Sequence, residues 1–69
     1  MDTYDKDLTP VEGKPGWFHG WGVLRHEPFH LAGVFKSQAY AQEQTAKAGE
    51  NYEVKRGIWE KGSTDFQIE

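Results

Sequence analysis

The chain contains no cysteine among its 69 residues. Disulfides and thiolate zinc sites are therefore excluded, and the composition fits a reducing compartment. No apolar run approaches the roughly 20 residues that a membrane-spanning helix needs. Residues 1–5 show no signal-peptide pattern of basic and then apolar residues. We therefore expect a cytoplasmic protein with no membrane partner.

Positive charge is also scarce. Eight Lys and Arg residues face eleven Asp and Glu residues, which gives a net charge of −3. Nucleic acids and anionic membranes usually bind a basic surface, so the balance makes nucleic acid an unlikely partner. Three Trp, three Tyr and four Phe supply the bulky apolar side chains that a short chain needs for its core. The length predicts one folded domain.

Two regions differ in pattern. Residues 1–16 are acidic and rich in turn-forming residues, which predicts a flexible arm. Residues 17–69 are expected to form the single domain. Within it, residues 17–25 and 29–35 alternate between apolar and other side chains around a break at Pro28, which indicates a β-hairpin.

A helix is predicted over residues 38–48, with Ser37 as its N-cap and Gly49 just after its end. Its stripe of small residues, Ala41, Thr45 and Ala48, would let it lie close to a sheet. Residues 51–59 alternate again and predict a third strand. Residues 65–68 are a candidate for a short C-terminal edge strand.

These elements predict an α+β fold of ββαβ arrangement. Because a helix joins the second and third strands, those two should run parallel, with the first strand between them and antiparallel to both. The result is a three-stranded antiparallel sheet in the order 2-1-3, with the helix packed on one face. The helix-covered face is expected to carry five bulky residues, namely Trp17, Trp21, Phe29, Leu31 and Phe35.

Residues 26–30 match H-E-x-x-H, the motif of zinc peptidases, but their context argues against that chemistry. The motif works on a helix, where both histidines share a face, whereas Pro28 would break a helix and the flanking sequence alternates with period two. A looser metal site from His19, His26 and His30 competes with the simpler interpretation of three surface histidines. We expect no metal, no cofactor and no catalytic residue, and hence no enzyme.

The opposite sheet face is predicted to be open, because no further element is available to cover it. It combines apolar side chains with a few charges, which is typical of a protein contact or a homodimer interface. The candidate partner-binding residues are Phe18, Leu24, His30, Val34, Lys55, Arg56 and Trp59. Aromatic side chains on a sheet also suit single-stranded nucleic acid, where Trp59, Phe18, Lys55 and Arg56 would make the contacts.

The third strand carries an aromatic-Glu-Val-x-Arg motif, at Tyr52, Glu53, Val54 and Arg56. With the strand–strand–helix–strand order, it resembles the small RNA-polymerase inhibitor of short-tailed coliphages. That resemblance implies a protein that binds the polymerase jaw and channel, with a contact at Arg56; a second arginine of the family pattern is Ile58 here. Residues 33–35 with the Ala-rich helix are also similar to half of a SPOR peptidoglycan-binding domain.

The leading hypothesis is therefore a small non-catalytic protein-binding module. It would be encoded by a phage or a mobile element and would bind and inhibit a host macromolecular machine. The alternatives are a weak single-stranded nucleic-acid-binding domain and a self-associating domain, in which a homodimer would hide the open face.

Overall fold

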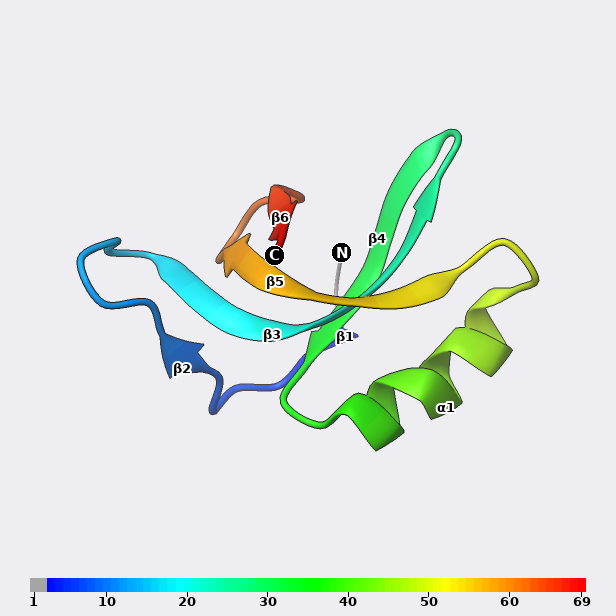
Figure 1. The fold of residues 1–69 in the computed structure, drawn as a ribbon, viewed down its shortest axis with the longest axis horizontal. Helices are drawn as coiled ribbons and strands as arrows, with labels where there is room; N and C mark the ends of the chain where they lie inside the picture. The colour runs from blue at the N-terminus through cyan, green and yellow to red at the C-terminus, as the bar shows by residue number, and fades with distance from the viewer. Residues whose placement is uncertain (1–2) are drawn as a thin grey trace.

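The computed structural model describes residues 3–69, which form one helix and six strands of a single mixed sheet (Figure 1). The α+β class with one helix is confirmed, whereas the prediction of a three-stranded antiparallel sheet is wrong. The strands run in the order β1-β4-β3-β5-β6, and β2 pairs with β3. Their bounds are β1 Thr3–Tyr4, β2 Thr9–Pro10, β3 Trp17–His26, β4 Phe29–Phe35, β5 Glu53–Glu60 and β6 Phe66–Ile68.

The centre of the sheet follows the predicted order. Strand β3 lies between β4 and β5 and is antiparallel to both. The β3–β4 hairpin turns at Glu27 and Pro28, and its tip projects beyond the rest of the sheet (Figure 1). Strand β6 adds the expected C-terminal edge next to β5. The sheet is mixed because β1 runs parallel to β4.

The segment predicted to be an arm contributes to the sheet. Of residues 1–16, the first two lie outside the described residues. The others supply β1 and β2, and the buried side chain of Leu8. Asp5 joins this segment to the end of β4, because its carboxylate accepts a hydrogen bond of 2.8 Å from the backbone N–H of Lys36.

Helix α1 spans Gln38–Ala48, as its local signals predict. The Ser37 hydroxyl accepts a hydrogen bond of 3.2 Å from the N–H of Tyr40, which satisfies one of the free donors of the first turn. The helix ends at Gly49, whose φ of 136° is open to glycine but costly for other residues. Among residues 3–69, no helix has the length and apolar character to cross a membrane.

A β-bulge changes which side chains of β4 face the helix. Val23 pairs with Gly33 but Leu24 pairs with Leu31, so Ala32 is an extra residue in β4. Because side chains alternate along a strand, one extra residue inverts every position beyond it. The prediction that Phe29 and Leu31 lie under the helix is therefore wrong.

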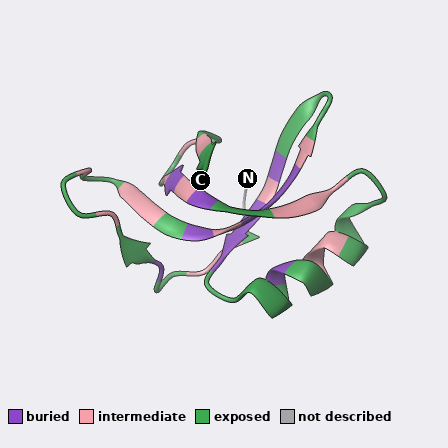
Figure 2. Ribbon diagram, viewed as in Figure 1, coloured by how far each residue is buried: buried purple, intermediate pink, exposed green. Residues whose placement is uncertain are grey.

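The two faces of the sheet carry two separate apolar clusters. Under the helix, Val23, Phe35 and Ala41 are buried together. On the opposite face, the buried cluster consists of Leu8, Leu24, Leu31, Val34 and Trp59, with Tyr4, Phe18 and Phe66 packed against it. Figure 2 shows buried residues along β3, β4 and β5, where the two clusters lie back to back across the sheet. The prediction that this second face is open is wrong.

Two strand glycines make room for one of the covering side chains. The atoms nearest to a Cβ built on Gly22 would be those of the Phe66 ring, at 2.8 Å, and a Cβ on Gly57 would meet the same ring at 2.9 Å as well as the carbonyl oxygen of Gln67. The ring of Phe66 therefore lies directly on the backbone of β3 and β5. The glycines that weaken the strand pattern are the reason that β6 can close over this face.

Candidate functional site

The residues predicted to bind a partner do not form one surface. Leu24, Val34 and Trp59 are at most 1% exposed and belong to the buried cluster opposite the helix. The indole N–H of Trp59 donates a hydrogen bond of 2.8 Å to the carbonyl of Ser63, and Tyr4 packs on its ring. These three side chains hold the N- and C-terminal segments on the sheet, so a partner cannot reach them in this fold.

The other predicted site residues lie in different places. Phe18 is partly buried against the same cluster. The bulge turns His30 to the helix side, where its Nδ1 is 2.5 Å from the hydroxyl of Tyr52. Lys55 lies on the face opposite the helix and pairs with Glu53 at 3.3 Å. Arg56 lies on the helix side of β5 and is 70% exposed.

The histidines of the H-E-x-x-H match are separated by the hairpin. His26 pairs with Phe29 in the register and His30 pairs with Arg25, so the two rings lie on opposite faces. His26 Nε2 is 3.3 Å from Glu53 Oε1, whereas His30 contacts Tyr52. No group of three metal-ligating side chains occurs within residues 3–69.

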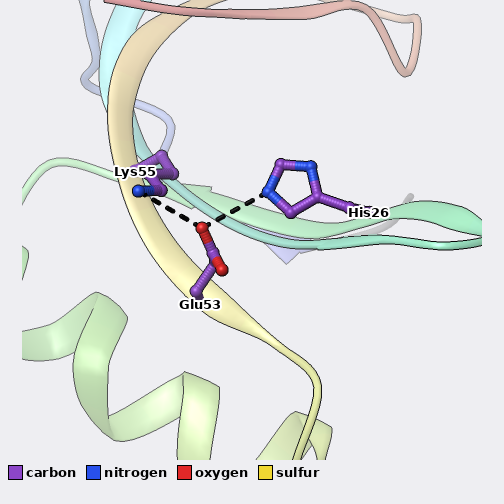
Figure 3. A network of polar contacts seen from close by, with 3 residues as sticks. All are labelled: His26, Glu53 and Lys55. Carbon is purple, nitrogen blue, oxygen red and sulfur yellow. Dashed lines mark hydrogen bonds and ion pairs between the residues drawn. The ribbon is translucent and has the colours of Figure 1, made fainter.

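Figure 3 shows the polar cluster of His26, Glu53 and Lys55 near the base of the hairpin tip. The hydrogen bond from His26, together with that from Lys55, lowers the pKa of the Glu53 carboxyl below its ordinary value of 4.5. The carboxylate is solvent-exposed, so the pair interactions are screened and contribute little to stability. The cluster fixes the start of β5 against the end of β3.

A different surface combines exposure with aromatic and cationic side chains. It is the end of the helix-side sheet face that α1 does not cover, and we call it the tryptophan face. Its residues on β3 and β5 are Trp17, His19, Trp21, Arg56, Ile58 and Glu60. The register pairs Trp21 with Arg56 and His19 with Ile58, so these side chains are neighbours on one face.

The helix leaves this end open because it is short. An α-helix of 11 residues is about 16 Å long, whereas a strand of ten residues spans about 33 Å. Figure 1 shows α1 under one end of β3 and β5 only. Trp21 lies at the boundary: it packs against the helix-side cluster and also lines the open part.

A groove of about 300 Å³ runs beside Trp21 on this face. It is lined by Thr9, His19, Gly20, Trp21, Lys36 and Arg56. Its ionisable side chains are therefore two cations and a histidine, without a carboxylate. The cleft beside Tyr4 and Trp59 differs, since Lys61 and Asp65 there carry opposite charges.

Carboxylates hold the two cations of the groove from its rim. Lys36 Nζ is 3.3 Å from Asp7, and Arg56 Nε is 3.5 Å from Glu69. All four side chains are at least 48% exposed, so each pair is weak in water. Both carboxylates come from the terminal segments of the chain.

Sequence reasoning placed Trp17 and Trp21 in the covered core, and it missed this surface. The signal that was available is the length difference between the predicted helix and the first strand.

No known protein family, curated protein or solved structure matches this chain in comparisons of sequence and fold.

Proposed function

We propose that this chain is a small non-catalytic protein-binding module, and that the tryptophan face is its contact surface. The observation that supports the proposal is the partial exposure of Trp17 and Trp21 on one strand, with Arg56 beside Trp21. Tryptophan and arginine are the residues that most often dominate the binding free energy of protein interfaces.

The remaining surface offers weaker candidates. Among the described residues, the large apolar side chains that are exposed are Phe29, Tyr40 and Ile68, on the hairpin tip, the helix and the edge strand, whereas Trp17 and Trp21 are partly buried. Single exposed apolar residues are common on protein surfaces and do not indicate a site. The tryptophan face is the place where bulky apolar side chains, a groove and exposed cations coincide.

The resemblance to the phage polymerase inhibitors implies a partner contact at Arg56, and Arg56 lies on the tryptophan face. We therefore retain the hypothesis that the partner is a large host assembly, such as the host RNA polymerase, that the module inhibits. The surface differs from the one that the sequence predicted, since Trp17 and Trp21 replace Trp59 and Phe18 as the aromatic contacts.

Affinity capture from a lysate of the host cell, with mass spectrometry, tests the proposal. The wild-type chain is expected to recover one specific assembly, and Trp21→Ala to lower its affinity about 30-fold, as for an interface hot spot of roughly 2 kcal/mol. Because Trp21 also packs against the helix, His19→Glu is a second variant: His19 is exposed, so this change leaves the core intact.

Phe29→Ala is the matched control, since it removes an exposed aromatic side chain away from the tryptophan face. Thermal unfolding of each variant shows whether it is folded. If folded His19→Glu and Trp21→Ala retain the partner with wild-type affinity, the tryptophan face is not the contact surface. Sedimentation velocity on the same samples tests the alternative of a self-associating domain.

Single-stranded nucleic acid is a second candidate for this face. Lys14 Nζ lies 4.2 Å from the ring centroid of Trp17, and Arg56 is the neighbour of Trp21. Bases stack on aromatic rings while cations contact the phosphates, and such binding weakens steeply with salt. Binding of oligodeoxythymidine that is lost in Trp21→Ala and at 0.5 M salt would favour this function over protein binding.

A further inference from the structure

We infer that the groove beside Trp21 binds an acidic, extended segment of a protein partner. The carboxylates of that segment would replace Asp7 and Glu69 on the two groove cations. This inference rests on the proposed function, because it names the kind of partner segment that the tryptophan face takes.

The first argument is the charge of the groove. Its ionisable lining side chains are His19, Lys36 and Arg56, although the chain as a whole carries a net charge of −3. Cationic side chains around a groove attract a partner of the opposite charge once the carboxylates that balance them, here Asp7 and Glu69, move away. The apolar wall formed by Trp21 adds a place for one aromatic or aliphatic side chain between the carboxylates.

The second argument is the state of the two cations. Each is held by a single carboxylate, from Asp7 at 3.3 Å and from Glu69 at 3.5 Å. Exposed pairs of this kind contribute little net free energy, so carboxylates of a partner can take their place at small cost. The chain's own acidic groups thus show which ligand chemistry the groove cations accept.

The third argument is the origin of those carboxylates. Asp7 lies between β1 and β2, and Glu69 follows β6, so both belong to short terminal segments at the rim of the sheet. They compete with the partner for the same two cations. Removing them should therefore tighten binding, an effect that a purely structural role would not produce.

Selection from a displayed library of random twelve-residue peptides tests the inference without knowledge of the natural partner. The expected binders are enriched in Asp and Glu around one aromatic or aliphatic residue. Their contact with Trp21 should appear as a shift of the NMR signal of its indole N–H. For such a peptide, Lys36→Gln and Arg56→Gln should each weaken binding about two- to fivefold, the range of an exposed ion pair.

The decisive variants are Asp7→Asn and Glu69→Gln, each of which should strengthen binding of the acidic peptide about two- to fivefold. Lys61→Gln is the matched control for Lys36→Gln, because it removes the same charge from a lysine outside the groove and should leave the affinity unchanged. A version of the peptide with Gln in place of Glu and Asp should bind about 4- to 25-fold more weakly, the product of two such ion pairs.

The outcomes separate the two proposals. Peptides that bind through Trp21 without acidic residues, or unchanged affinity in Asp7→Asn and Glu69→Gln, would overturn the acidic partner and leave protein binding standing. If the selection yields no peptide whose binding depends on Trp21, the result would count against both protein binding and the acidic segment. This holds whether or not oligodeoxythymidine binds there.

Discussion

The contact of Phe66 with the glycines of the sheet can be tested by a double-mutant cycle. In Gly22→Ala, the three atoms nearest to the new Cβ would all belong to the Phe66 ring, at 2.8 to 3.0 Å. Overpacking of this kind typically costs about 1–3 kcal/mol. We expect about 2 kcal/mol, which corresponds to a fall in Tm of about 10 °C for a domain of this size.

The same substitution should be harmless once the ring is gone. A Phe66→Ala background removes the three atoms that the new Cβ would crowd, and alanine is favoured over glycine in a strand by about 0.5–1 kcal/mol because it restricts the unfolded chain. Gly22→Ala should then be neutral or slightly stabilising. The coupling free energy between the two positions is expected to be about 2 kcal/mol or more.

Gly57→Ala provides the matched control within the same contact. Its Cβ would meet the Phe66 ring at 2.9 Å, but it would also clash with the backbone carbonyl of Gln67. Removal of the ring therefore cannot rescue it fully. Urea unfolding followed by tryptophan fluorescence measures all the variants, and Phe66→Leu replaces Phe66→Ala if the latter is unfolded. An equal cost of Gly22→Ala in both backgrounds would refute the placement of Phe66 on the sheet.

Three further predictions concern local interactions. Ser37→Ala should lower the free energy of unfolding by about 1 kcal/mol through loss of the helix N-cap, as measured by chemical denaturation, and an unchanged midpoint would contradict that role. The lowered pKa of Glu53 means that its contribution to stability is present above pH 4.5 and is lost as the pH falls through the folded-state pKa. His26→Ala should raise that pKa toward 4.5 in a carboxyl NMR titration, whereas no change would exclude the hydrogen bond. Trp59→Phe should lower the free energy of unfolding by about 1 kcal/mol because the part-buried carbonyl of Ser63 loses its donor, and a neutral effect would argue against that bond.

Local signals explain why the helix could be predicted to the residue. Ser37 and Gly49 act on the backbone next to them, so their effect does not depend on the rest of the fold. The order of the three central strands followed for a similar reason. A helical connection between two strands requires them to run parallel, and β3 is the strand available to lie between them.

The strand faces were predictable only up to the bulge. Alternation assigns Phe29 and Leu31 to the side of Phe35, but one extra residue at Ala32 reverses them. Gly33 lies next to the bulge, and a Cβ atom at this position would lie 2.6 Å from the ring of Phe35. The glycine is therefore the residue in the sequence that reflects the close packing around the bulge. A glycine in a strand has several causes, and the pattern alone does not distinguish among them.

The covering of the second face depends on contacts that no local pattern encodes. Leu8 and Phe66 are single apolar residues in polar surroundings, near opposite ends of the chain, and they meet the sheet only in the folded state. Their packing on the sheet buries Leu24, Val34 and Trp59. The predicted partner-binding surface therefore loses three of its residues to the core. Both terminal segments pack on the face opposite α1. The tryptophan face, at the end of the helix side that α1 does not cover, is therefore the remaining candidate for a binding surface.

Packing accounts for part of that candidate surface and leaves another part unexplained. Trp21 packs against the helix-side cluster, so its presence is justified by stability as well as by binding. Trp17 and Ile58 are packed against neither cluster, although both lie on strands of the sheet. Both side chains are partly buried, and the part of each that stays exposed lies outside the two apolar clusters. A contact with another molecule gives these two residues a physical role, and for that reason the tryptophan face is the surface on which the proposed function depends.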